Sequence, residues 1–431
     1  MDMRRKDEFD ERLTLTIVVM IVVILLMVTM LSNTGKGGPP VKITSLGQLQ
    51  PSQGPVSKRL RAWYGRVLDT EGPNQFIVGT SDGQTITEFN NPAFASRPEF
   101  LAASDNGSNL LFTVPIAGGW HSLHRIDQYG NYKQIKVQDS KDIHVLATAA
   151  DDSKAYVLAH NDKDIAVYGC AWDEEEATVE AGSSVTAASV PTTASFVLLQ
   201  DGFAYDHAAS GGTNVLRVRG ATPTSYPVST PVDLLHAIKD QLHAVAGPDK
   251  ALFWLGAAGV EPVKANAAAA VDTAAAAAGA ITKVDQVATV DTDLLVRAAN
   301  QVYRVSAAAA TQLPFAPASD TVSEVTGNSY AWALASIGAD TFLWKGVPNV
   351  FIQFTDKFGD APRLLTAFGD GVVLAAGTST LHRYGPFGNP IAKHELPDTH
   401  IRALWATSDA IYALVEDTSQ NPPPTDLYIW R

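Results

Sequence analysis

One short motif in the chain has the spacing of a catalytic nucleophile. Gly79-Thr80-Ser81-Asp82-Gly83 follows the Gly-x-Ser-x-Gly pattern, in which a strained turn between a strand and a helix exposes a serine hydroxyl. Here the next residues, 84–89, alternate as a strand does, and Asp82-Gly83 is a strong hairpin signal. The motif is therefore interpreted as a hairpin turn, and no catalytic residue is assigned.

Two histidines lie three residues apart, as metal ligands on a helix often do. On a strand, however, His121 and His124 would point to opposite faces, and the alternation over 123–128 favours a strand. The other histidines are scattered along the chain and could meet only if inner strands of a ring brought them together: His207, His236, His243 and His382. We assign no metal ion and no other cofactor.

Acidic residues gather in three runs, at Asp151-Asp152, 162–164 and 173–176. None of these has the regular oxygen-ligand spacing of a calcium loop, so they are interpreted as solvated turns. Together they could instead mark a face that meets a basic partner. The single cysteine, Cys170, cannot form an intramolecular disulfide and is expected to be a small buried apolar side chain.

Two segments have the composition of contact surfaces. Basic and aromatic side chains cluster after residue 57, which suits an interface or a membrane-proximal surface, although an ordinary first strand would look the same. A proline run near residue 423 should form a stiff projecting loop. The candidate interface residues are Arg59, Arg61, Trp63, Tyr64, Pro422, Pro423 and Pro424.

An apolar segment over residues 13–31 has the length that a helix needs to cross a bilayer. A removable signal peptide is the alternative, but the segment is longer than such peptides need and no small-x-small cleavage site follows it. We therefore expect a retained anchor, represented along its length by Leu13, Ile17, Ile21, Ile24, Val28 and Leu31. Basic residues concentrate before the segment, which predicts a cytoplasmic N-terminus: Arg4, Arg5, Lys6 and Arg12.

These features divide the chain of 431 residues into a cytoplasmic tail (1–12), a transmembrane helix (13–31), a linker rich in glycine and proline (32–57) and an extracytoplasmic domain (58–431). The net charge of −13 disfavours nucleic acid, because phosphate backbones are bound by clustered Lys and Arg. The localisation that follows is a single-pass protein of the cell (inner) membrane with a periplasmic or extracellular domain.

The large domain shows a repeating phrase of short strands. An apolar strand, a turn, a second apolar strand, another turn and a strand with an aromatic or basic residue recur about every 40 to 50 residues. The phrases begin near Phe100, His144, Ala194, Leu234, Val287, Glu324, Leu364 and Ile401. Because the last phrase supplies only three strands, a strand from the N-terminal side should complete it, and 84–89 is the candidate. The alanine tracts at 267–278 and 307–310 are read as loops or weak strands, with a short helical insert as the alternative.

This plan resembles β-propellers in general, without the repeated signature of any one propeller family. The resemblance implies an all-β fold of about eight four-stranded blades, with seven as the alternative. We expect a non-enzymatic accessory or scaffold subunit of a multi-subunit membrane complex, whose partners are the lipid bilayer and the other subunits. The complex could serve energy transduction, secretion or envelope assembly. The alternative is an extracytoplasmic enzyme or small-ligand binder that uses the central channel.

Overall fold

Strands make up almost all the regular structure of the computed structural model. The structure describes residues 40–47, 68–72, 75–79, 86–90, 100–104, 109–127, 131–187, 190–191, 194–209, 212–266, 279–347, 350–355, 358, 360–387, 389–406, 410–421 and 425–430. Within these ranges the only helical elements are two 3-10 turns, η2 (Ala117–Gly119) and η3 (Gln138–Ser140). The all-β prediction is therefore confirmed.

The first part of the unit that spans Pro40–Trp430 is a run of antiparallel meanders, each ordered along the chain. Their strands are β5 (Leu101–Ala103), β6 (Asn109–Pro115), β7 (His121–Asp127) and β8 (Tyr132–Val137); β9 (His144–Ala150), β10 (Lys154–His160), β11 (Asp164–Ala171) and β12 (Glu176–Val179); β14 (Phe196–Leu199), β15 (Gly202–Ala209), β16 (Gly212–Arg219) and β17 (Thr222–Val228); β18 (Val232–Ile238), β19 (Gln241–Ala246), β20 (Ala251–Gly256) and β21 (Gly259–Pro262).

The same plan continues to the last described residues. The strands are β23 (Val284–Val290), β24 (Asp293–Ala298), β25 (Gln301–Ser306) and β26 (Ala309–Gln312); β28 (Thr321–Gly327), β29 (Ala331–Ile337), β30 (Asp340–Val347) and β31 (Val350–Gln353); β32 (Pro362–Phe368), β33 (Gly371–Ala376), β34 (Thr380–Tyr384) and β35 (Pro390–Glu395); β36 (Thr399–Ala406), β37 (Ile411–Asp417) and β38 (Thr425–Trp430). Every phrase start predicted from sequence lies on, or within two residues of, one of the first strands of these meanders.

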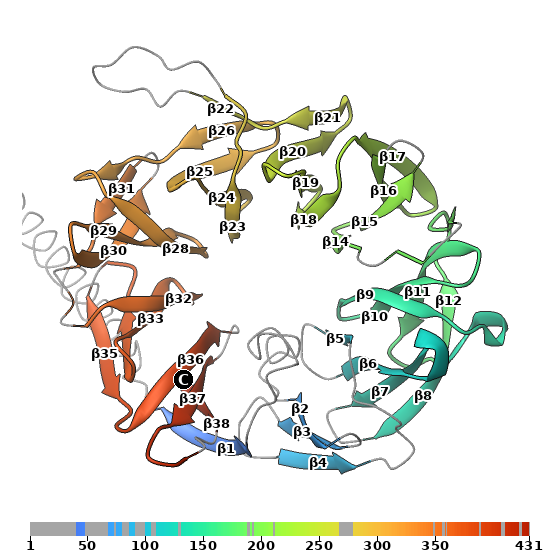
Figure 1. Ribbon diagram of the computed structural model, residues 1–431, viewed down its shortest axis with the longest axis horizontal. Coiled ribbons are helices and arrows are strands. Elements are labelled where there is room, and N and C mark those ends of the chain that lie inside the picture. Colours follow the sequence, from blue (N-terminus) through green and yellow to red (C-terminus); the bar gives the residue numbers. More distant parts are fainter. Residues whose placement is uncertain are drawn as a thin grey trace, which may run out of the picture. The chain divides into compact units, whose positions relative to one another are not determined.

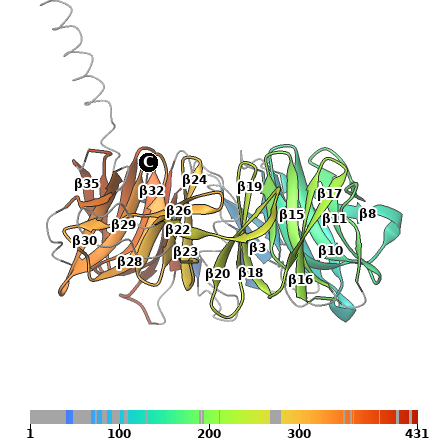
Figure 2. The ribbon, with the colours of Figure 1, turned by 90° about the horizontal axis from the view of Figure 1, so that it is seen from above.

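The sheets of this unit follow one another around a ring (Figure 1), and their strands run between its two faces (Figure 2). The first strands face inward. β5, β9, β14 and β18 touch in succession, and β23, β28, β32 and β36 do the same. This radial order of meanders is the arrangement that a propeller requires.

Some outer edges are covered by short strands that pair in parallel. β12 pairs in parallel with β8, β22 (Lys264–Asn266) with β26, and β27 (Phe315–Ala316) with β31. A further short strand, β13 (Val185–Thr186), pairs with β11. Such pairing protects strand edges that would otherwise attract other chains.

The strand that completes the last meander is not the predicted one. β1 (Val41–Gly47) pairs with β38, so part of the segment 32–57, predicted as a linker, is a strand. The predicted closing strand 84–89 overlaps β4 (Ile86–Asn90), which forms a three-stranded sheet with β2 (Leu68–Gly72) and β3 (Gln75–Gly79). Nearby glycines and prolines conceal β1 in the sequence, whereas its ladder with β38 satisfies its backbone groups.

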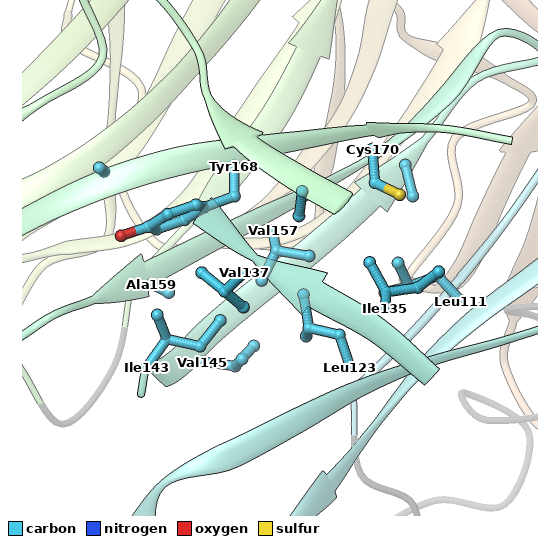
Figure 3. Packing of buried hydrophobic residues seen from close by; sticks show 13 residues of the cluster. Leu111, Leu123, Ile135, Val137, Ile143, Val145, Val157, Ala159, Tyr168 and Cys170 are labelled. Carbon is cyan, nitrogen blue, oxygen red and sulfur yellow. The ribbon is translucent and has the colours of Figure 1, made fainter. Parts of the chain in front are cut away.

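Hydrophobic clusters join each meander from β5 to β38 to the next. One of them packs β6–β8 against β9–β11 around Leu111, Ile135, Val157 and Tyr168 (Figure 3). Cys170 belongs to this cluster and is 2% exposed, so the sequence interpretation of a buried apolar thiol is confirmed. Burial raises its pKa to about 11. The core therefore lies between sheets rather than at the centre of the ring.

No helix long and apolar enough to cross a membrane occurs in the part of the chain that the structure describes. The predicted anchor 13–31 and its basic flank lie outside the described residues. The anchor therefore remains a prediction.

Candidate functional site

A basic residue recurs on the third strand of several sheets, and some of these side chains lie between one sheet and the next. Third strands carry a basic residue in five of the sheets: Arg125 on β7, Arg217 on β16, Arg304 on β25, Lys345 on β30 and Arg383 on β34. Three of these residues, Arg125, Arg217 and Lys345, are buried. An ionised side chain is costly to bury without partners. The surroundings of each buried cation therefore show whether the protein itself supplies its partners or leaves room for a ligand.

Arg125 donates hydrogen bonds to the backbone at the end of the next sheet's third strand, β11. Its Nη1 donates to the carbonyl oxygens of Ala171 at 3.3 Å, of Trp172, and of Glu174 at 3.0 Å, all at the end of β11. Carbonyl dipoles thus replace a carboxylate as its partners. Arg125 therefore joins two sheets through Nη1.

Lys345 is held by a carbonyl oxygen and by aromatic rings. Its Nζ donates to Pro386 O at 2.5 Å and lies 3.7 Å from the centroid of the Tyr330 ring. Three more rings lie within 6 Å of the same nitrogen: Trp332, Phe354 and Phe387. Desolvation lowers the pKa of Lys345. Phe387 is 81% exposed, so one ring of this cage faces solvent.

A cavity of about 220 Å³ adjoins this lysine, between β23–β26 and β28–β31. Its polar lining includes Arg304, Ser329, Tyr330 and Lys345. The Nε of Arg304 donates to Asp293 Oδ2 at 2.6 Å, so its charge is already compensated. The cavity is therefore mainly aliphatic, with the ring of Tyr330 and the amine of Lys345 in its wall, and it is small for an organic ligand.

Arg217 has fewer partners than the other two buried cations. Its Nη2 donates to Asp240 O at 2.8 Å, while its Nε is buried with no hydrogen-bond partner. It lines a groove of about 510 Å³ between β16–β17 and the β20–β21 turn. This guanidinium is the least satisfied of the buried cations in the described part of the chain.

Inner strands are also tied to their neighbours by polar side chains. Gln286 on β23 makes two hydrogen bonds with the backbone of Val325 on β28. Arg363 on β32 donates to Thr378 O at 3.3 Å and to Ile401 O on β36. These two inner-strand side chains are thus engaged in joining sheets.

The histidine pair lies on one strand, as predicted, and each member has a structural role. His124 contacts Ser122 Oγ at 2.7 Å and Tyr132 Oη at 2.6 Å, and burial lowers its pKa to about 4. His121 Nδ1 accepts a hydrogen bond from Val145 N. No group of three or more His, Cys, Asp or Glu side chains that could hold a metal ion is found among the described residues.

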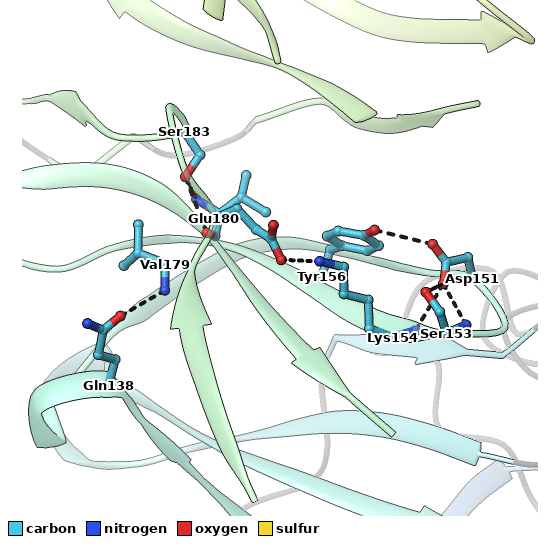
Figure 4. A network of polar contacts seen from close by, with 9 residues as sticks. Gln138, Asp151, Ser153, Lys154, Tyr156, Val179, Glu180 and Ser183 are labelled. Atoms are coloured by element: carbon cyan, nitrogen blue, oxygen red, sulfur yellow. Dashed lines mark hydrogen bonds and ion pairs between the residues drawn. The ribbon is translucent and has the colours of Figure 1, made fainter. Parts of the chain in front are cut away.

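The acidic runs lie mostly in turns, as expected from the sequence, except that Asp164 begins β11 and Glu176 begins β12. Asp151 Oδ1 accepts hydrogen bonds from the backbone nitrogens of Ser153 and Lys154, at 2.7 and 2.9 Å, and these lower the pKa of Asp151 although burial opposes them (Figure 4). Lys154 Nζ also pairs with Glu180 at 2.5 Å. Glu175 pairs with Lys133 at 2.5 Å, on an exposed surface. These carboxylates organise loops.

The predicted interface residues cannot be compared with this geometry. Arg59, Arg61, Trp63, Tyr64 and Pro422–Pro424 all lie outside the described residues, as do Ser81 and Asp82 of the nucleophile-like motif. The buried cations, in contrast, were missed by the sequence analysis. The signal was present, because the third strand of the repeating phrase carries a basic residue.

No protein-family model matches the chain, and no curated protein matches it. Among solved structures, it is similar to BamB from Moraxella catarrhalis (11% identity, 91% of this chain and 98% of that one, TM-score 0.41). It is also similar to the β-propeller domain of the Trilobed protease from Pyrococcus furiosus (9% identity, 85% and 90%, TM-score 0.37). A third similar structure is Prp20p from Saccharomyces cerevisiae (10% identity, 85% and 93%, TM-score 0.36), described with its binding to Gsp1p and histones.

With TM-scores of 0.41 or less, these likenesses carry no argument about what the chain does. The fold is assigned from the chain's own meanders, their inward first strands and the cores between neighbouring sheets. The chain is a β-propeller repeat protein.

Proposed function

We propose that this protein is a non-enzymatic scaffold or accessory subunit of a multi-subunit membrane complex. The observation that carries the proposal is the use of polar side chains between sheets. Arg125, Gln286, Arg363 and Lys345 each bond to the backbone of the neighbouring sheet. Such bonds stiffen the ring, so that its loops can vary as docking surfaces without disturbing the frame.

The predicted anchor adds the membrane to this proposal. A helix over 13–31, with the basic residues before it on the cytoplasmic side, would hold the ring in the periplasm or outside the cell. The bilayer and the other subunits are then its partners. We further propose that the ring has eight blades, begun by β5, β9, β14, β18, β23, β28, β32 and β36, in addition to the sheet β2–β4.

Gentle solubilisation of native membranes tests the scaffold function. The full chain should co-migrate with other subunits in one particle, and imaging of that particle would count the blades. A double variant, Ile21→Arg with Ile24→Arg, should lose membrane retention, since each charge at mid-membrane costs about 2.5 to 3.5 kcal/mol. Thr14→Ala is the matched control. A wild-type ring that migrates alone from membranes would refute the proposal.

A second candidate function is the binding of a small ligand in the cavity beside Lys345. It is favoured by the aromatic ring of Tyr330 and the desolvated amine of Lys345, which both line the cavity. A monomer that carries a small molecule in this cavity after purification would support it. The volume of about 220 Å³ is below the usual range of ligand pockets and restricts the ligand to a small molecule.

A further inference from the structure

The groove at Arg217 has one wall of paired strands and one wall of small residues. Arg217 lies opposite Thr224 in the β16–β17 ladder, so both side chains point to the same face of the sheet. Arg219 and Tyr226 share this face because strand side chains alternate with a period of two. The other wall is the turn at Ala257-Ala258, both of which are exposed.

The charge of Arg217 is the unusual feature of this groove. Its side chain is 7% exposed, yet its one hydrogen bond goes to a neutral carbonyl. The nearby carboxylates are engaged by Arg219 instead, which pairs with Asp201 at 3.0 Å and Asp240 at 3.7 Å. A buried cation without a counter-ion is strongly unfavourable. An anion bound in the groove would supply the counter-ion that Arg217 lacks.

The balance of charges favours a carboxylate over a phosphate. Asp201 and Asp240 both pair with Arg219, so with Arg217 the four charges sum to zero, and Arg217 is the member of this group that has no carboxylate of its own. A monovalent carboxylate matches the single charge and the planar guanidinium of Arg217, whereas a phosphate dianion would add a second negative charge beside the two aspartates. Thr224 supplies a hydroxyl donor on the same face.

The edge of the sheet argues against recognition by strand addition. β17 is the outer strand and contains Pro223 and Pro227, which cannot donate to a ladder. A partner strand would therefore find a broken row of donors. Recognition in this groove must rest on side chains.

We propose that this groove is a binding site for a carboxylate group, with Arg217 as its fixed cation. The carboxylate comes either from an acidic side chain of a peptide segment or from a free carboxylic acid. The site concerns the ring alone and does not depend on the anchor. An experiment can therefore refute this binding site without refuting the scaffold function, and the reverse.

Fluorescence anisotropy on the full-length protein in detergent tests the proposal. The probe is a labelled peptide, acetyl-Gly-Glu-Gly-Glu-Gly-amide, and its Gln counterpart is the neutral control. The Glu peptide should bind at least tenfold more tightly than the Gln peptide. Arg217→Gln should remove that preference, and Arg402→Gln, which alters an exposed arginine paired with Glu416, should not.

A second variant keeps the test valid if Arg217→Gln fails to fold. Ala258→Trp fills the groove from its exposed turn and should weaken Glu-peptide binding at least tenfold with an unchanged unfolding midpoint. Butyrate, a monovalent acid, would identify a free acid as the ligand if it competes at equal concentration, whereas failure to compete would identify the peptide. Equal binding of both peptides, stronger competition by inorganic phosphate than by either carboxylate, or insensitivity to both groove variants would overturn the proposal.

Discussion

Gln286 and Val325 form a two-bond clasp between adjacent inner strands. The Nε2 of Gln286 donates to Val325 O at 2.8 Å, and its Oε1 accepts from Val325 N at 2.9 Å. The side-chain amide thus mimics a backbone group and satisfies both polar atoms of Val325, a residue that is 1% exposed. The clasp lies where β28 departs from regular pairing, since its register with β29 shifts between Val322 and Glu324.

Removal of this clasp should destabilise the ring. Gln286→Ala leaves a buried N–H and a buried C=O without partners, and we expect a loss of about 2 to 4 kcal/mol in the free energy of unfolding. Gln286→Glu keeps the acceptor but loses the donor, so it should also destabilise. Urea unfolding followed by tryptophan fluorescence measures both. Gln134→Ala, at an exposed position of β8, is the control and should change stability by less than about 0.5 kcal/mol.

His243 should make the ring sensitive to acid. Its Nε2 lies 2.9 Å from Ala307 O and its Nδ1 is buried without a partner, so the neutral ring fits and the imidazolium does not. Burial lowers the pKa of His243 to about 4. As pH falls from 6.5 to 4, the unfolded chain gains a proton that the folded protein does not, and stability is lost.

Replacement of His243 tests whether this residue lowers the unfolding free energy as the pH falls. In His243→Gln the fall in unfolding free energy between pH 7 and pH 4.5 should be smaller than in the wild type by about 2 kcal/mol. Urea titrations at a series of pH values give this difference. An identical pH profile in the two proteins would show that His243 titrates normally in the fold.

Asp206 should make the folded protein more stable as the pH falls, whereas His243 makes it less stable. Desolvation raises its pKa to about 6, while its Oδ1 accepts a hydrogen bond from Ser195 N. The folded protein therefore binds a proton between pH 6 and pH 4 that the unfolded chain does not, so this group adds stability as pH falls. Asp206→Asn keeps the acceptor and cannot titrate. It should be at least as stable as the wild type at pH 7.5 and should lose more stability on acidification, by about 2 kcal/mol.

The sequence predicts the repeating strands well because their signals are local. Alternation and turn residues lie within each unit, so a start such as Leu364 falls inside β32 and a turn near Asp370 precedes β33. The pairing of β1 with β38 joins residues far apart in the chain and leaves no local signal. Burial of Arg217 and Lys345 also depends on the neighbouring sheet. From sequence alone, these cations look like the solvent-facing residues of an alternating strand.

The cage around Lys345 gives a test of coupling between a cation and a ring. Tyr330→Leu removes the ring that lies 3.7 Å from Nζ and leaves the amine desolvated. The free energy of unfolding should therefore fall by more than the loss of packing contacts alone would cause. In Lys345→Met, which keeps an unbranched chain, the same tyrosine substitution should cost less. A double-mutant cycle from urea unfolding should therefore give a coupling free energy of about 0.5 to 2 kcal/mol. Tyr330→Phe is the matched control, because it keeps the aromatic face and should leave that coupling nearly intact. If the two single substitutions are additive, the amine is held by Pro386 O alone, and the rings serve only as packing.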